Sequence, residues 1–353
     1  MQFVMSDFMI IKALLFSSLA FIFTVAWTPL FTHFVYKYRL GKQIRDDGST
    51  PVFSRLHAHK AGTPTMGGIL IWVTTLIFGL GFFYLARFFP ATIFSKLNFL
   101  SRSETWLPLG CLVSAAIVGL VDDYLDVRRR GYKNRGIKFS HKLLIYAVIA
   151  LVGALWFYYK LSWDIIHIPF LGTFSIGAYY IIFFIAVVVG TAFAVNQTDG
   201  LDGLAGGILL SSFTTYCVIA FMMGKYDLAV FCAVIVGALL AFLWFNINPA
   251  RFIMGDTGSI SLGITLALVA LYTNTAFILP FIGLVFVAEA LSTVIQILSK
   301  KFRNGKKVFI SSPIHHHFEA LGWSEPKIVM RFWVIAWVSA ALGIIIFILD
   351  KQF

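Results

Sequence analysis

Apolar runs of helix-spanning length recur along the whole chain and alternate with short polar segments. A helix of about 20 apolar residues is long enough to cross the hydrocarbon core of a bilayer. The pattern therefore predicts an all-α polytopic membrane protein with about ten membrane helices. We place these helices near residues 9–34, 66–89, 105–123, 142–160, 177–195, 204–223, 227–245, 258–273, 276–299 and 328–349.

Composition supports this class. The 353 residues are 59% hydrophobic and only 12% charged. A water-soluble domain does not need so large a hydrophobic share. The first apolar run has no small-residue cleavage site behind it, so we expect a retained helix. Cys111, Cys217 and Cys232 all lie in apolar runs and are expected to be small buried hydrophobes. We expect one membrane domain over residues 1–353.

The net charge of +12 is concentrated in alternate loops, after the first, third and ninth predicted helices. The positive-inside rule places these loops in the cytoplasm and both termini outside. The expected cytoplasmic loops lie near residues 35–65, 122–141, 196–203, 246–257 and 300–327. The basic excess therefore reflects topology and an anionic substrate, and we expect no nucleic-acid partner.

Carboxylates gather in the loops expected on this same side. They are Asp122, Asp123 and Asp126 at the end of the third helix, Asp199 and Asp202 after the fifth, and Asp256 before the eighth. Such a cluster is repulsive unless a cation enters it. Carboxylate oxygens favour a hard cation, and Mg²⁺ is usual where phosphates complete its shell. Lys60 and Lys142, the basic residues that we expect nearest the cluster, could bind the remaining phosphate charge.

Each acidic segment also has a simpler interpretation. Asp256 could cap the helix that follows it, and Asp199 with Asp202 could form a solvated turn. The run Arg128–Arg130 is typical of a topology anchor.

Three further features leave two interpretations open. The histidines of PIHHHFE could contact substrate or simply form a loop, because adjacent residues of a helix cannot all face one metal ion. The segment GTPTMGG could bind phosphate through its backbone, or begin a helix with Thr63 or Thr65 as its cap. Glu289 lies inside an apolar run, where an acid is either functional or hydrogen-bonded to a neighbouring helix.

DDYLD, which contains Asp126, matches the DDxxD pattern of UbiA-type membrane prenyltransferases, which hold Mg²⁺ and diphosphate. That interpretation gives PIHHHFE, GDTGS and GTPTMGG no role. A carboxylate-lined transporter is a third class, although a transporter spreads its charges along a midplane path.

Five motifs together resemble another family, the phospho-N-acetylmuramoyl-pentapeptide transferases or MraY translocases. They are HKAGTPTMGG (59–68), VGLVDDY (118–124), NQTDGLDGLAGG (196–207), FNINPARFIMGDTGS (245–259) and PIHHHFE (313–319). Their order and spacing are those of the family. The WecA-like relatives that transfer N-acetylglucosamine-1-phosphate share the aspartates but look less similar around GTPTMGG and the histidines.

The resemblance implies a Mg²⁺-dependent enzyme of the bacterial cytoplasmic (inner) membrane, with periplasmic termini and its active site on the cytoplasmic face. Undecaprenyl phosphate would attack UDP-MurNAc-pentapeptide, giving lipid I and UMP in peptidoglycan biosynthesis. The partners implied are these two substrates and the lipid bilayer. A homodimer is expected from the family alone.

The resemblance also implies roles for residues at matching positions. The metal ligand would be Asp256, and the catalytic group would be Lys60, Asp122, Asp123, Asp256, His315 and His316. The substrate-binding group would be Thr65, Lys142, Asn196, Asp199, Gly200, Leu201, Asp202, Asn246 and His317.

Two residues depart from the family pattern. The family usually has lysine at the position of Asp126, and this departure creates the DDxxD pattern. The family usually has phenylalanine at the position of Ile253, where it helps to form the uracil pocket, so we do not expect Ile253 to stack on uracil in the family's manner. Adjacent helical residues point about 100° apart. We therefore expect Asp122 to face the lipid phosphate and Asp123 to face the diphosphate or a basic partner.

Overall fold

The computed structural model describes residues 2–41, 60, 62–101, 104–132 and 136–352. Most of the predicted loop at 35–65 therefore lies outside the described residues. The helices are α1 (Gln2–Lys37), α3 (Ile69–Phe88), α4 (Ile93–Leu97), α5 (Trp106–Val127), α6 (Phe139–Leu155), η3 (Trp156–Lys160), α7 (Tyr179–Thr198), α8 (Leu204–Met222), α9 (Tyr226–Asn246), α10 (Asp256–Tyr272), α11 (Leu279–Ile282), α12 (Leu284–Phe302), α13 (Ile314–Ala320) and α14 (Glu325–Asp350). A short hairpin joins η3 to α7 and consists of β1 (Ile165–Ile168) and β2 (Gly172–Ser175).

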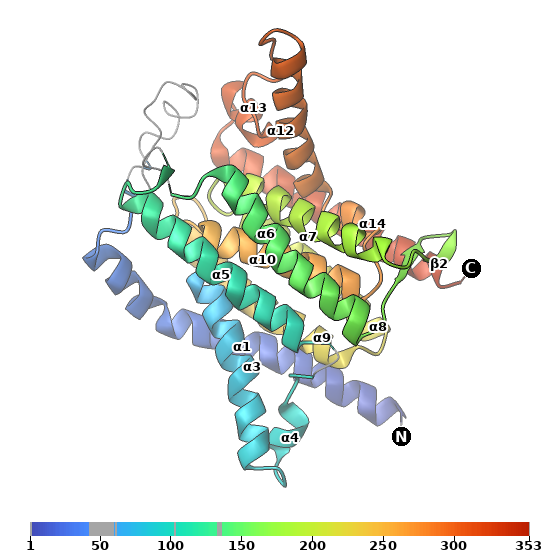
Figure 1. Cartoon of the computed structure of the whole chain (residues 1–353). Helices are drawn as coiled ribbons and strands as arrows, with labels where there is room; N and C mark the ends of the chain where they lie inside the picture. The colour runs from blue at the N-terminus through green and yellow to red at the C-terminus, as the bar shows by residue number, and fades with distance from the viewer. Residues whose placement is uncertain (1, 42–59, 61, 102–103, 133–135, 353) are drawn as a thin grey trace.

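The helix α10 lies at the centre of the bundle (Figure 1). Every residue of α10 after Asp256 is buried, and the helix packs against α5, α7, α8 and α3. A helix that is apolar all round needs protein on all sides, which is what these neighbours provide. Its first residue, Asp256, is thereby held inside the bundle near the end of α5.

Within the described residues, eight helices are long and apolar enough to span a membrane, which makes the chain a polytopic helical membrane protein. They are α1, α3, α5, α6 with η3, α7, α8, α9 and α14. The central α10 is apolar but shorter. The total of ten spans stays a prediction.

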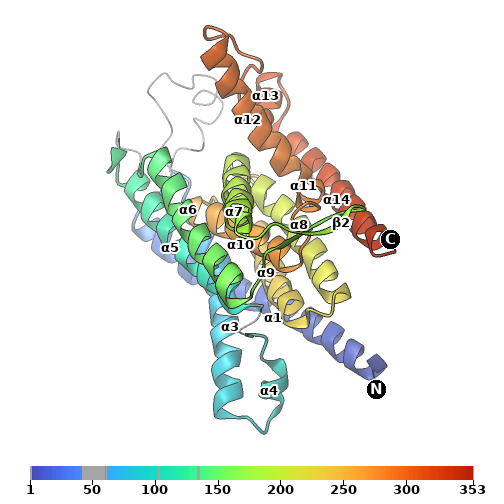
Figure 2. The same ribbon diagram turned by 45° about the vertical axis from the view of Figure 1, so that its right-hand side comes forward.

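The predicted continuous helix at 276–299 is wrong. The chain forms the short helix α11, leaves helical geometry at Gly283, and continues as α12. Gly283 explains the break, because glycine disfavours a helix interior, and Pro280 marks the first turn of α11, where proline is tolerated. The buried face of α12 is polar, with Glu289, Ser292, Thr293, Gln296 and Ser299 at helical spacing. This helix projects from the bundle in both views (Figures 1 and 2).

The all-α expectation also misses the hairpin of β1 and β2, which pair antiparallel with Ile165 opposite Ser175. Asp350, the last residue of α14, fastens this hairpin. Its carboxylate accepts the backbone N–H of Phe170 at 2.7 Å and lies 2.5 Å from Nε2 of His167. The two chain ends lie on the same side of the bundle as the hairpin (Figures 1 and 2).

Two predicted boundaries need correction at the opposite end. The helix α5 continues to Val127, so Asp122 and Asp123 lie inside its last turns and not in a loop. The segment GTPTMGG does not begin α3 with a threonine cap, because the N-cap is Gly68 and no side chain caps it. Instead its backbone pairs with the segment before α10: Gly67 N–H donates to Ile253 O at 2.8 Å and Gly68 N–H to Met254 O at 2.9 Å.

Candidate active site

The metal candidate Asp256 is the first residue of α10 and meets side chains from two other helices. Its Oδ2 lies 2.7 Å from Nζ of Lys142 in α6, and its Oδ1 accepts a hydrogen bond from Nδ2 of Asn196 in α7 at 2.9 Å. Asn196 also donates to the Ser259 hydroxyl at 3.1 Å, which fixes the amide. The carboxylate does not cap its own helix, so that simpler interpretation is wrong.

Asp122 approaches the same lysine from α5. Its Oδ2 forms an ion pair with Lys142, while Oδ1 accepts the Ile137 N–H at 2.6 Å. One ammonium group therefore lies between two carboxylates. We call Asp122, Lys142 and Asp256 the open cluster, because the Lys142 and Asp256 side chains each keep 20% of their surface exposed.

Asp123 has a different task. Its Oδ1 accepts the N–H of Asp256 at 3.0 Å and its Oδ2 accepts the N–H of Thr257 at 3.1 Å. These are unpaired donors of the first turn of α10, so Asp123 caps that helix from α5. The expectation that Asp123 faces the diphosphate or a basic partner does not match this geometry. The separation of the two adjacent aspartates into different tasks does match it.

Glycines allow the helices to meet closely here. A Cβ at Gly119 of α5 would overlap the backbone of Asp256, and a Cβ at Gly68 would overlap the backbone of Gly258. The first turn of α10 is thus held at backbone contact distance from α5 and from the start of α3. The position of the Asp256 carboxylate follows from these contacts.

The turn between α7 and α8 carries the other predicted acids, and it is not a solvated turn. Asp199 accepts the Gly255 N–H at 3.1 Å, beside the start of α10. Asp202 is buried and lies 2.7 Å from Nζ of Lys60. Its Oδ2 accepts Asn248 Nδ2 at 3.0 Å and the Ala250 N–H at 3.1 Å.

Glu325, at the start of α14, completes a second lysine-centred group. Its Oε1 lies 2.5 Å from Nζ of Lys60 and accepts the Asp202 N–H at 2.6 Å. We call Lys60, Asp202 and Glu325 the closed cluster, since their side chains expose 12%, 7% and 9% of their surface. The sequence analysis missed Glu325, because an acid in the first turn of a helix reads as an ordinary favourable charge.

Three predicted substrate-binding residues lie between these clusters and are buried. Asn246 joins two loops: it accepts the Gly203 N–H at 3.0 Å and donates to Phe252 O at 2.8 Å. Thr65 lies beside Gly255, and Leu201 packs in the core. In this conformation these side chains support the loops around the site.

The histidines lie on α13 and form separate contacts. Nδ1 of His315 lies 2.9 Å from Oε2 of Glu289 in α12, and both residues are fully buried. His315 Nε2 faces Gly200, where a Cβ would overlap it. Among the described residues, neither this Nε2 nor Glu289 Oε1 has a hydrogen-bond partner. Glu289 thus makes the hydrogen bond to another element that one interpretation expected, and its partner is a predicted catalytic residue.

The neighbouring histidines point elsewhere. His316 Nδ1 lies 2.6 Å from Glu319 Oε2, and His317 Nδ1 accepts the Ile310 N–H at 3.2 Å. The three imidazoles therefore do not form a joint metal site. The departures from the family pattern lie at the margins: Asp126 is half-buried in the last turns of α5, and Ile253 pairs with Gly67 through its backbone.

The donor set around Lys142 suits Mg²⁺ in one binding mode only. Among the described residues, no three His, Cys, Asp or Glu side chains converge into a ligand set. Asp122 and Asp256 nevertheless place their carboxylate oxygens on either side of one cationic group, the Lys142 ammonium. Mg²⁺ commonly takes only one or two protein carboxylates and completes its shell with water and substrate phosphates. The open cluster fits Mg²⁺ in that mode and does not fit an all-protein cage.

Comparison with known proteins agrees with the motif pattern. The profile of glycosyl transferase family 4 matches residues 105–274, and the phospho-N-acetylmuramoyl-pentapeptide-transferase signature 1 matches residues 60–71. The phospho-N-acetylmuramoyl-pentapeptide-transferase of Chloroflexus aggregans is 40% identical over 345 residues, covering 94% of this chain and 89% of that protein. The chain belongs to the phospho-N-acetylmuramoyl-pentapeptide transferase family.

Other members of the transferase family are similarly close. The transferase of a Geobacillus species (strain WCH70) is 40% identical over 334 residues, and that of Listeria innocua is 37% identical over 332 residues. The alignments cover 93% and 94% of this chain, and 95% and 97% of the relatives. The recognition made from the five motifs is confirmed. The roles of individual site residues stay predictions.

Proposed function

We propose that this chain transfers phospho-MurNAc-pentapeptide from UDP-MurNAc-pentapeptide to undecaprenyl phosphate. A phosphate oxygen of the lipid attacks the phosphorus attached to the sugar, the bond from that phosphorus to UMP breaks, and lipid I forms. The open cluster carries the proposal, because it gathers opposite charges from α5, α6 and α10 at one partly exposed point. Family membership supplies the substrate class.

The barrier in such a reaction is mainly the repulsion between an anionic nucleophile and an anionic diphosphate, so positioning and charge neutralisation should dominate. Lys142 supplies one positive charge and is oriented by Asp122. When bound, Mg²⁺ would neutralise further phosphate charge, with Asp256 as its main protein ligand and Asp122 beside it. Asp123 acts indirectly by holding the first turn of α10.

Proton removal supplies a small share of the rate. The second pKa of a phosphate monoester is about 6, so the lipid phosphate is already largely dianionic at neutral pH. Asp122 therefore chiefly positions the reacting groups and acts only secondarily as a base. We expect direct displacement and not an aspartyl intermediate.

The proposed orientation places the open cluster at the cytoplasmic face of the inner membrane and both termini in the periplasm. Two features support it: the described basic residues that directly follow α1 and α5 lie at this end of the bundle, and the two ends of the described chain lie at the other. Ten spans would follow if α10 and the α11–α12 segment also cross or enter the bilayer. A homodimer remains an expectation from the family.

One assay tests both reaction and orientation. The protein is reconstituted into sealed vesicles with undecaprenyl phosphate and Mg²⁺, and UDP-MurNAc-pentapeptide is added outside. The orientation is read from a variant that carries Lys301→Cys and in which Cys111, Cys217 and Cys232 are replaced by serine. An impermeant thiol reagent labels this variant only where position 301 faces the outside of the vesicle. We expect UMP release from the vesicles that are labelled. UMP release from UDP-GlcNAc alone would indicate the WecA-like activity, and diphosphate release from a prenyl diphosphate would indicate the UbiA-type reaction.

A further inference from the structure

Glu289 is the only acidic residue of α12, and the open cluster makes no use of it. Its Oε2 lies 2.9 Å from Nδ1 of His315 in α13, and neither side chain exposes any surface. The two residues are 26 positions apart, so the contact joins two helices. Because burying an acid costs free energy, the pair calls for a role beyond packing.

A carboxylate beside Nδ1 controls where the imidazole carries its proton. A neutral histidine can carry it on either ring nitrogen, and the partner of one nitrogen decides which. An ionised carboxylate can only accept a hydrogen bond, so Glu289 in this form fixes the proton on Nδ1 and holds the ring in one orientation. An amide in its place could accept from Nδ1 or donate to it. Nε2 is the nitrogen left for another partner.

Nε2 of His315 faces the turn between α7 and α8. A Cβ built at Gly200 would overlap the imidazole, with Nε2 nearest and the ring carbons Cε1 and Cδ2 at 2.8 and 3.3 Å. The turn therefore approaches the nitrogen end of the ring and not its face. Among the described residues, this buried Nε2 has no hydrogen-bond partner. Buried polar atoms without a partner are rare, so this nitrogen needs an explanation.

The turn that Nε2 faces connects the open and closed clusters. On one side of Gly200, Asp199 accepts the N–H of Gly255, the residue before Asp256. On the other side, Asp202 belongs to the closed cluster. His315 thus lies against the backbone that joins the two lysine-centred groups.

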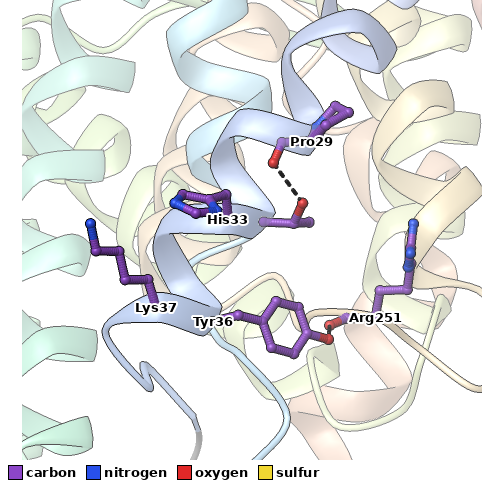
Figure 3. Close-up of a pocket in the computed structure, with 6 residues that line it drawn as sticks. Pro29, His33, Tyr36, Lys37 and Arg251 are labelled. Atoms are coloured by element: carbon purple, nitrogen blue, oxygen red, sulfur yellow. Dashed lines mark hydrogen bonds between the residues drawn. The ribbon is translucent and has the colours of Figure 1, made fainter.

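The α9–α10 loop holds the same turn in place. Asp202 Oδ2 accepts the N–H of Ala250 at 3.1 Å. The next residue, Arg251, is tied to α1, because the Tyr36 hydroxyl donates to its backbone carbonyl at 3.1 Å (Figure 3). Since these contacts set the position of the turn, the orientation of the His315 ring decides what Nε2 meets there.

We propose that Glu289 is a positioning residue for the transfer reaction. It fixes the proton of His315 on Nδ1 and directs Nε2 at the α7–α8 turn, where a substrate group bound against Gly200 is its partner. The inference rests on the proposed function, because it takes the nucleotide-sugar donor to bind at this turn. Glu289 touches no substrate itself and acts only through His315.

The first test compares two substitutions whose effects on stability and activity run in opposite orders. With UDP-MurNAc-pentapeptide, undecaprenyl phosphate and Mg²⁺, Glu289→Gln should lower kcat for UMP release roughly 10- to 100-fold at a nearly parental melting temperature. Glu289→Asp keeps the carboxylate but leaves a gap of one methylene, so it should be less stable than Glu289→Gln and yet more active. Activity that follows the order of stability would overturn the positioning role, as would parental kcat in Glu289→Gln.

Asp350→Asn is the matched control, because it makes the same change in another acid–histidine pair. Asp350 Oδ2 lies 2.5 Å from Nε2 of His167 at the hairpin end of the bundle. This variant should keep the parental kcat. An equal loss of kcat in Asp350→Asn would reduce the effect at Glu289 to general destabilisation and overturn the proposal.

Solid-state ¹⁵N NMR of ring-labelled histidine reads the protonation of His315 without an activity assay. Its resonances are those that disappear in His315→Gln. We expect a protonated Nδ1 in the parent and in Glu289→Asp, and a smaller protonated fraction in Glu289→Gln; an unprotonated Nδ1 in the parent would overturn the proposal. A parent that released no UMP would remove the proposed function, and this measurement would then decide the positioning of His315 separately.

A double-mutant cycle tests whether Glu289 acts through His315. Adding Glu289→Gln to His315→Gln should lower kcat no further, because the ring that Glu289 positions is already absent. If the two losses multiplied instead, Glu289 would act by another route and the proposal would be overturned.

Discussion

The open and closed clusters have the same composition, one lysine between two carboxylates, and differ in what surrounds them. In the open cluster, Lys142 and Asp256 keep a fifth of their side-chain surface exposed. In the closed cluster all three side chains expose 12% or less of their surface, whereas in the open cluster only Asp122 is buried to that extent, at 6%. We therefore expect the open cluster to exchange its ammonium for another cation more readily than the closed cluster.

Because the two clusters contain the same residue types, we expect any difference in their roles to follow from burial. Breaking a buried pair leaves an uncompensated charge and costs stability. A partly exposed pair is screened by solvent and contributes less to folding. We therefore expect substitutions in the open cluster to change turnover first and substitutions in the closed cluster to change stability first.

The largest expected effect belongs to Asp256. The substitution Asp256→Asn keeps the size of the side chain but removes the charge that would hold Mg²⁺, so kcat should fall by about 10²- to 10³-fold. The melting temperature should stay close to that of the parent. Asp164→Asn, at the hairpin end, is the matched control and should retain full activity. If Asp256→Asn lowered the melting temperature substantially along with kcat, the two clusters would not differ in the way that we expect.

Glu325→Gln should give the next largest effect, on stability. Lys60 would lose one of its two carboxylates, and we expect the free energy of unfolding to fall by about 1–3 kcal/mol. Denaturant-induced unfolding in detergent, followed by tryptophan fluorescence, measures this change. An unchanged unfolding midpoint with a large loss of kcat would place Glu325 in the reaction instead.

The smallest expected effect is on Mg²⁺ binding, and it tests whether Lys142 occupies a cation site. In Lys142→Gln the carboxylates of Asp122 and Asp256 no longer share an ammonium, so they should bind Mg²⁺ more tightly. Added Mg²⁺ alone should then raise the melting temperature more than in the parent, because ligand stabilisation grows with the ratio of concentration to Kd. Lys60→Gln is the comparison variant and should show no such gain. If added Mg²⁺ raised the melting temperature equally in all three proteins, the idea that Lys142 occupies the Mg²⁺ position would be contradicted.

Much of the site was predictable because its motifs occupy the same end of successive helices. Charge alternation and apolar periodicity correctly indicated a polytopic helical protein with acids gathered at one end. What the sequence could not supply was the direction of each side chain. Asp122 and Asp123 are adjacent and chemically identical, yet one pairs with Lys142 and the other caps α10.

Other misses have similar causes. The run 276–299 is apolar enough to suggest one helix, but Gly283 interrupts it, and the polar stripe of α12 becomes meaningful only with α13 beside it. The hairpin at 165–175 contains too few residues for a periodic pattern to stand out. Lys60 contacts Glu325, which lies 265 positions away, and no local pattern announces such a pair.

The close approach of Gly68, Gly119 and Gly258 has a consequence for directed evolution. Because backbone atoms of α3, α5 and α10 meet there, any side chain added at these positions must move a whole helix. A library aimed at new nucleotide-sugar donors should therefore keep the three glycines fixed. Diversity is better placed at half-buried positions such as Ile253, whose side chain can change while its backbone pairing with Gly67 persists.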